Sequence, residues 1–191
     1  MNGIDEVVGA VEAGQLVVVP TDTVYGLACR PDREAVHALS ALKGRSVDQP
    51  IALVAASVDA VAELVPELAG RTVPRGAFTI VLPNPARRLP WLAGVRPDTI
   101  GVRIPEATGV AAELLGRVGA IAATSANLHG GTDPRRLADV PREILDAVGA
   151  ILDGGDLPGT PSTVVDLTGP EPRVLREGAV PSAEALALVA E

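Results

Sequence analysis

The sequence predicts an α/β fold, with one domain in which helices cover a mixed β-sheet. Hydrophobic residues make up 47% of the 191 residues, which is enough for a sizeable core, whereas aromatic residues make up only 2%. A core built from Ala, Val, Leu and Ile suits sheets buried under helices better than an all-β sandwich. We find no internal repeat or long linker, so we expect a single domain over residues 1–191.

The first expected elements are a helix, a buried strand and a second helix. Apolar side chains have helical spacing over residues 4–13, and Gly14 ends this segment before the apolar run 16–19. A second helix is expected from Asp32, a favourable N-cap, to Gly44, which suits a helix C-terminus. The two basic residues beside Gly44 therefore flank a helix terminus.

The middle of the chain predicts three strands and one helix. Strands are expected at 51–55 and 78–82, and Ser57 is a good N-cap for a helix that Pro66 interrupts. Residues 98–105 alternate as a strand with one packed face does. That strand places Ile100, Val102 and Ile104 on one face and Thr99, Gly101 and Arg103 on the other. Its polar face is expected to point away from the packed one.

The rest of the chain continues the alternation of helices and strands. The expected elements are a helix at 110–117, a strand at 120–123 followed by the polar turn T-S-A-N, a helix with Pro141 at its first position, and strands at 150–152, 163–167 and 173–175. A Gly/Pro-rich loop, D-G-G-D-L-P-G-T-P, precedes the last two strands.

Charge and cysteine content narrow the function classes. A net charge of −8 argues against a surface coated with basic residues for nonspecific nucleic-acid binding, so any RNA contact must be local. The single cysteine, Cys29, excludes a disulfide within the chain and a Cys-based zinc site, and it fits the cytosol. Asp5 and Glu6 stand where a signal peptide carries positive charge, and no apolar run reaches membrane-spanning length. We therefore expect neither export nor membrane insertion.

The one lysine of the chain is a candidate phosphate ligand. Of 16 basic residues, 15 are arginine, and the exception, Lys43, lies in K-G-R beside Arg45. Lysine offers phosphate a compact point charge and arginine a planar fork, so the two are not interchangeable at a tight site. Two interpretations stay open at this point: a phosphate-binding pair, or an incidental pair of surface charges.

Polar side chains also cluster directly after predicted strands. P-T-D-T-V-Y-G-L spans residues 20–27, T-S-A-N spans 124–127, and P-S-T at 161–163 follows the Gly-rich loop. Such positions carry ligand groups in α/β proteins, although turns and helix caps explain the same residues. Arg103 needs a partner on its strand face, and the best bidentate match is a carboxylate, from a ligand or from one of the chain's 24 acids. P-loop, dinucleotide-binding and nucleophile-elbow motifs are absent.

Six blocks together carry a family resemblance. P-T-D-T-V-Y-G-L, K-G-R, G-V-R-I-P, A-T-S-A-N, the D-G-G loop with P-S-T-V-V-D, and V-L-R-E-G occur in order between residues 20 and 178. Together they resemble the YrdC-like family of threonylcarbamoyl-AMP synthases. The resemblance implies a twisted mixed sheet flanked by helices around a large open cleft.

The resemblance also implies an activity and its residues. L-threonine, bicarbonate and ATP would give threonylcarbamoyl-AMP and pyrophosphate, for modification of the tRNA adenosine beside the anticodon, with Mg²⁺ supplied alongside ATP and no metal site built by the protein alone. The family's threonine-binding positions match Thr23, Arg103, Ala123 and Ser162, its ATP-binding positions match Lys43, Arg45, Thr99, Ser125 and Arg176, and further candidates are Tyr25 and Asn127. Lys43 and Arg45 are the expected catalytic pair.

Some features depart from the family pattern or leave alternatives. Gln49, Val54 and Asp133 stand where other members carry different residues. Longer relatives add a domain that closes over the site, which we do not expect after Glu191. A separate tRNA threonylcarbamoyl transferase is the expected partner. The alternatives are a noncatalytic RNA-binding module of the same fold, and carbamoyl transfer in hydrogenase maturation, whose zinc-finger segments this chain lacks.

Overall fold

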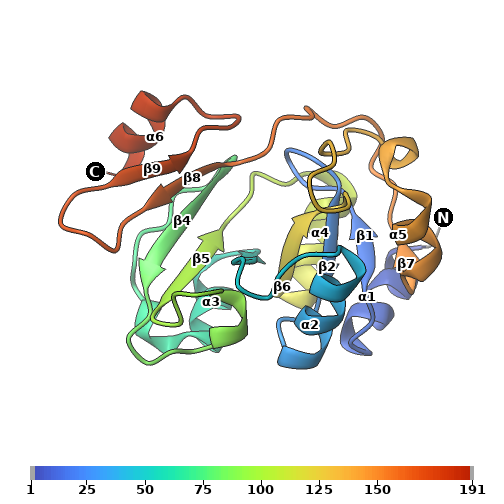
Figure 1. Ribbon diagram of the computed structural model, residues 1–191, viewed down its shortest axis with the longest axis horizontal. Coiled ribbons are helices and arrows are strands. Elements are labelled where there is room, and N and C mark those ends of the chain that lie inside the picture. The colour runs from blue at the N-terminus through green and yellow to red at the C-terminus, as the bar shows by residue number, and fades with distance from the viewer. Residues whose placement is uncertain (1–2, 190–191) are drawn as a thin grey trace.

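A mixed sheet of nine strands runs through the molecule in the order β7-β1-β2-β6-β3-β5-β4-β8-β9 (Figure 1). The computed structural model describes residues 3–189. The strands are β1 (Val17–Val19), β2 (Gly26–Cys29), β3 (Ala52–Ala55), β4 (Phe78–Pro83), β5 (Thr99–Arg103), β6 (Ala120–Ser125), β7 (Ala150–Ile151), β8 (Thr163–Asp166) and β9 (Arg173–Arg176). Because parallel and antiparallel pairs both occur, the sheet is mixed, as the sequence predicts.

Helices flank this sheet. They are α1 (Ile4–Glu12), α2 (Arg33–Leu42), α3 (Val58–Leu64), α4 (Gly109–Val118), α5 (Arg142–Ala147) and α6 (Ser182–Val189), with short 3-10 turns at Pro66–Leu68, Pro90–Leu92 and Leu137–Asp139. Figure 1 shows α1 and α5 near β7 at one end of the sheet and α6 beside β9 at the other. Within residues 3–189, we find no helix that is long and apolar enough to cross a membrane.

Two apolar clusters lie on opposite faces of the sheet. In β1, Val17 and Val19 pack with α1 and α4, whereas Val18 packs with α2 and α5. This separation follows from the strand geometry, which points successive side chains to opposite faces. The cluster that contains α1 and α4 covers only the part of the sheet from β7 to β3. Beyond β3, the same face carries polar residues of the site, namely Arg103 on β5, Thr79 on β4 and Ser162 directly before β8.

Most of the predicted elements are confirmed, including both N-caps. The side chains of Asp32 and Ser57 accept hydrogen bonds from the backbone at the starts of α2 and α3. One position differs by a single residue, since α5 begins at Arg142 and Pro141 precedes it as N-cap. We did not predict α6, which lies after the last motif.

The prediction of a polar turn at T-S-A-N, residues 124–127, is wrong for its first two residues. Thr124 and Ser125 belong to β6 and pair with Leu27 and Gly26 of β2. The sequence analysis did not predict β2, because its four residues directly follow the polar segment 20–25. Without that partner strand, nothing in the sequence indicates that β6 continues beyond Ala123.

Candidate functional site

The segment between β1 and β2 is a tight turn fixed by Thr21. Its hydroxyl donates to the Val24 carbonyl at 2.7 Å and accepts from the backbone N–H groups of Thr23 at 3.1 Å and Val24 at 3.2 Å. The Thr21 and Thr23 hydroxyls are 3.0 Å apart. The Thr21 hydroxyl thus bonds three backbone groups of the turn and also contacts the Thr23 side chain.

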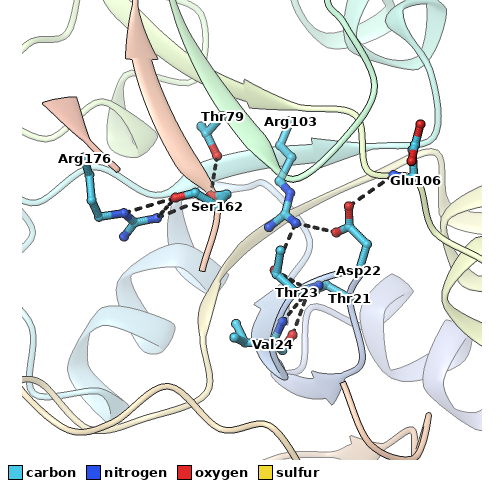
Figure 2. A network of polar contacts seen from close by, with 9 residues as sticks. All are labelled: Thr21, Asp22, Thr23, Val24, Thr79, Arg103, Glu106, Ser162 and Arg176. Carbon is cyan, nitrogen blue, oxygen red and sulfur yellow. Dashed lines mark hydrogen bonds and ion pairs between the residues drawn. The ribbon is translucent and has the colours of Figure 1, made fainter. Parts of the chain in front are cut away.

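Two residues of this turn, Asp22 and Thr23, bind Arg103 (Figure 2). Arg103 Nη2 donates to Thr23 Oγ1 at 3.0 Å and forms a close ion pair with Asp22 Oδ1. The other Asp22 oxygen accepts from the backbone N–H of Glu106 at 3.2 Å. Arg103 lies on the strand face opposite Ile100 and Val102, as the alternation predicts. It is nevertheless only 7% exposed, and the acidic partner that the sequence left as an alternative is present.

Ser162 and Arg176 form the next group of contacts. Arg176, on β9, donates from Nη2 to the Ser162 carbonyl at 2.7 Å and from Nε at 3.2 Å. Ser162 Oγ lies 3.1 Å from Thr79 Oγ1 of β4 and 3.3 Å from Arg176 Nη2. Figure 2 shows this group facing the Arg103 group across the end of β5.

Lys43 directly follows α2 and is buried, with 4% of its surface exposed. Its ammonium donates to the carbonyls of Ser125 at 2.5 Å and Asn127 at 2.7 Å, and to Asn127 Oδ1. Asn127 Oδ1 also accepts from Ser125 Oγ at 2.7 Å. The structure thus brings Lys43 together with Ser125 and Asn127, which follow it in the sequence by 82 and 84 residues.

Arg45 approaches the same end of β6. Its Nη1 donates to Thr124 Oγ1 at 3.0 Å and its Nη2 to the Pro50 carbonyl at 2.6 Å. The Nε atoms of Arg45 and Arg103 are buried and have no hydrogen-bond partner among the described residues. A buried N–H without an acceptor is costly, so these two donors are suited to ligand oxygens.

The four cations influence one another. Burial lowers the pKa of Lys43 to about 8, with Arg45 adding to this effect and Asp133 opposing it. Burial and then the charge of Arg176 lower the pKa of Arg45. Burial also lowers the pKa of Arg103, which Asp22 opposes and Arg176 reinforces. Like charges held this close together favour the binding of an anion.

Three predicted residues lie outside these contacts. The Tyr25 hydroxyl is engaged elsewhere, since it donates to Asp153 Oδ1 at 2.7 Å and to the Gly155 carbonyl at 2.9 Å. Thr99 lies at the opposite end of β5 from Arg103, and its hydroxyl donates to the carbonyl of Arg96. Ala123 is paired on both sides within the sheet. Their substrate roles stay predictions.

The sequence analysis missed three residues of the site. Asp22 and Thr124 lie inside quoted motifs, but their neighbours received the roles. Thr79 lies in the expected strand 78–82, to which no site residue was assigned. Val54, a departure from the family pattern, pairs in register with Arg103 and packs in the apolar cluster of α1 and α4.

This arrangement defines a class of protein before any relative is considered. The chain is an α/β protein in which two buried cations, Lys43 and Arg103, lie with the half-buried Arg45 and the exposed Arg176 in one site. Two buried arginine N–H groups without a partner among the described residues are available there to an anionic ligand. The family model Sua5/YciO/YrdC, described as "Telomere recombination", matches residues 9–178. The chain belongs to this family.

Individual relatives agree with this assignment. A Mycobacterium tuberculosis protein is 40% identical over 187 residues, covering 94% of this chain and 85% of its own length. A Pyrococcus abyssi protein named threonylcarbamoyl-AMP synthase is 35% identical, covering 96% of this chain and 56% of its own length. The crystal structure of P. abyssi Sua5 complexed with L-threonine superposes with a TM-score of 0.85 at 34% identity, covering 98% of this chain and 57% of that one. The chain therefore spans little more than half of the P. abyssi protein.

Proposed function

We propose that this protein is a threonylcarbamoyl-AMP synthase, which joins L-threonine, bicarbonate and ATP into threonylcarbamoyl-AMP with release of pyrophosphate. One observation carries the proposal. A guanidinium with an adjacent hydroxyl, Arg103 with Thr23, lies beside three cations whose hydrogen bonds within the described part of the chain go to neutral acceptors. The first group suits an amino acid and the second a triphosphate. The names of the relatives support the same activity.

In this proposal the reaction has two stages. The threonine amine first takes up bicarbonate, with loss of water, to give a carbamate. A carbamate oxygen then forms a bond to the α-phosphorus of ATP while the bond from that phosphorus to the bridging oxygen breaks, and pyrophosphate leaves with the electron pair. Negative charge grows on phosphate oxygens in this step, so fixed cations lower its barrier.

The cations have distinct parts in that step. Arg45 and Arg176 form no ion pair with an acid in the part of the chain that the structure describes, and they would neutralise the phosphates. The ammonium of Lys43 already bonds to the end of β6, so its part would be to hold Ser125 and Asn127 in place while adding positive charge. Thr23 and Arg103 would bind threonine, with Ser162 between the two groups.

Magnesium would enter with the nucleotide. Among residues 3–189 no group of three or more His, Cys, Asp or Glu side chains is placed to hold a metal ion. The cations and unpaired donors fit a phosphate chain, whose own oxygens would bind Mg²⁺ and whose charge the ion would help to neutralise. The site residues of this chain would then position the phosphates around it.

The expected surroundings follow from the same proposal. The product would pass to a separate transferase that modifies tRNA, and any direct RNA contact would be local because the chain is acidic. We place the reaction in the cytosol because the one cysteine is free and buried.

Pyrophosphate release tests the proposed function. The purified protein is incubated with ATP, Mg²⁺ and bicarbonate, with and without L-threonine, and with serine and alanine as controls. We expect release that depends on threonine and bicarbonate, and threonylcarbamoyl-AMP in the mixture by mass spectrometry. Folded protein that releases no pyrophosphate under any of these conditions would instead favour the noncatalytic RNA-binding alternative.

A further inference from the structure

One cation of the site differs from the other three in its partners. Arg103 is ion-paired with a carboxylate, that of Asp22. Lys43, Arg45 and Arg176 form no ion pair with an acid among residues 3–189, and their hydrogen bonds go to carbonyl, amide or hydroxyl oxygens. The site therefore has one region in which the cation is ion-paired with an acid and one in which positive charge is in excess, although the charge of Asp133 acts on Lys43.

These two regions match two kinds of ligand. A triphosphate carries several negative charges and is attracted by uncompensated cations. An amino acid at neutral pH carries one carboxylate and one ammonium group, so its net charge is zero. A guanidinium whose charge is already balanced gives little attraction to a simple anion, whereas a guanidinium beside a carboxylate can pair with both ends of a zwitterion.

The geometry around Arg103 supports the second match. Asp22 and Thr23 both accept from the same nitrogen, Nη2, and Nε of Arg103 is buried without a partner. The Thr23 hydroxyl oxygen accepts one hydrogen bond from Arg103, and its second lone pair can accept one from a ligand. A ligand whose carboxylate reaches Arg103 thus meets two acceptors close by, which favour an ammonium or hydroxyl donor on the same molecule.

We propose that Asp22 is a specificity-determining residue, whose carboxylate makes the Arg103 subsite select an amino acid zwitterion over a carboxylate that lacks the amine. This inference rests on the proposed function and deepens it. Asp22 also accepts from the Glu106 backbone N–H, so a merely structural role is the competing explanation. The two explanations differ in whether the loss of Asp22 changes the relative affinity for two ligands or weakens both equally.

Direct binding separates them. Isothermal titration calorimetry is run with L-threonine and with 3-hydroxybutanoate, which is threonine without its amine. For the unaltered protein we expect L-threonine to bind at least about tenfold more tightly, which corresponds to roughly 1.4 kcal/mol. In Asp22→Asn, an uncompensated Arg103 should attract the simple carboxylate more strongly, so the preference should fall by about tenfold. Asp22→Glu keeps the charge and should keep a preference for threonine.

A matched control removes another paired carboxylate. Asp139 forms an ion pair with Arg136 outside the site, so Asp139→Asn should leave the preference unchanged. Equal weakening of both ligands in Asp22→Asn would overturn the proposal in favour of a structural role. If Asp22→Asn does not fold, as judged by thermal unfolding, the unaltered protein decides: binding of 3-hydroxybutanoate as tight as that of L-threonine would overturn it.

The same titration keeps the two proposals distinguishable. If the unaltered protein binds L-threonine but the preference does not depend on Asp22, only the assignment of Asp22 fails. If it binds ATP but no L-threonine under any condition, the proposed function fails, and the inference fails with it.

Discussion

Replacement of Lys43 by alanine should destabilise the fold as well as the nucleotide site. Its ammonium makes three hydrogen bonds, each of the kind worth about 2 kcal/mol when one partner is charged. Burial and, to a lesser extent, the charge of Arg45 oppose the charged form, since the pKa falls from 10.5 to about 8, a penalty of about 3 kcal/mol. Roughly 3 kcal/mol of stability should therefore be lost, which for a domain of this size lowers Tm by roughly 6 to 12 °C.

Differential scanning calorimetry measures this loss, and Arg45→Ala is the matched control. Arg45 makes two hydrogen bonds, but its removal also relieves repulsion with Lys43 and Arg176, so its Tm should fall by less. Both variants should weaken ATP binding. A Lys43→Ala protein that melts with the unaltered protein, or an Arg45→Ala protein that is destabilised more, would refute the argument that Lys43 holds the end of β6.

Three further outcomes are expected. Tyr25→Phe should cost about 1 to 3 kcal/mol in chemical denaturation and leave the threonine requirement unchanged, because the Tyr25 hydroxyl bonds Asp153 and the D-G-G loop; an altered threonine KM at full stability would show a substrate role. Arg103→Ala should raise the KM for threonine more than that for ATP, and equal changes in steady-state kinetics would contradict the assignment. Burial on β8 raises the pKa of Asp166, but hydrogen bonds from Thr168 and the ion pair with Arg96 outweigh it and lower this pKa from 3.8 to about 2. The stabilising effect of Asp166 is therefore present above about pH 4 and is lost as the pH falls toward 2. Asp166→Asn should thus be less stable than the unaltered protein at pH 7, and the difference in Tm should vanish near pH 2.

The sequence predicts the fold well where local patterns suffice. Period-two alternation placed Arg103 opposite Ile100 and Val102, and Asp32 marked the start of α2, because both depend on neighbours a few residues away. The four-residue strand β2 was missed because so short an apolar run has no periodicity of its own, and its pairing with β6 joins residues nearly 100 positions apart.

Only part of the site could be predicted, because the partners of its residues are distant in the sequence. The unusual single lysine and the polar face of β5 drew attention to Lys43 and Arg103 from residue chemistry alone. What each of them bonds could not be predicted, since the partner of Arg103 lies 81 residues away, and no local rule selects Asp22 from the acids of the chain. The contacts of Lys43 likewise could not be predicted, because they require the end of β6 to lie beside the end of α2, 82 residues earlier in the sequence.

The sheet order has a consequence for the order in which the molecule can assemble. β1 pairs with β7, which is more than 130 residues later in the sequence, and Tyr25 reaches across a separation of 128 residues to Asp153. Ser162 and Arg176 follow Thr23 in the sequence by more than 130 residues. During synthesis β1 cannot pair with β7 until β7 has been made. Because such pairs close long loops, loop closure should limit the folding rate. A ribosome-bound chain that has not yet exposed Arg176 lacks one of the site's cations, so full affinity for nucleotide should arise only after the segment that contains β9 has emerged.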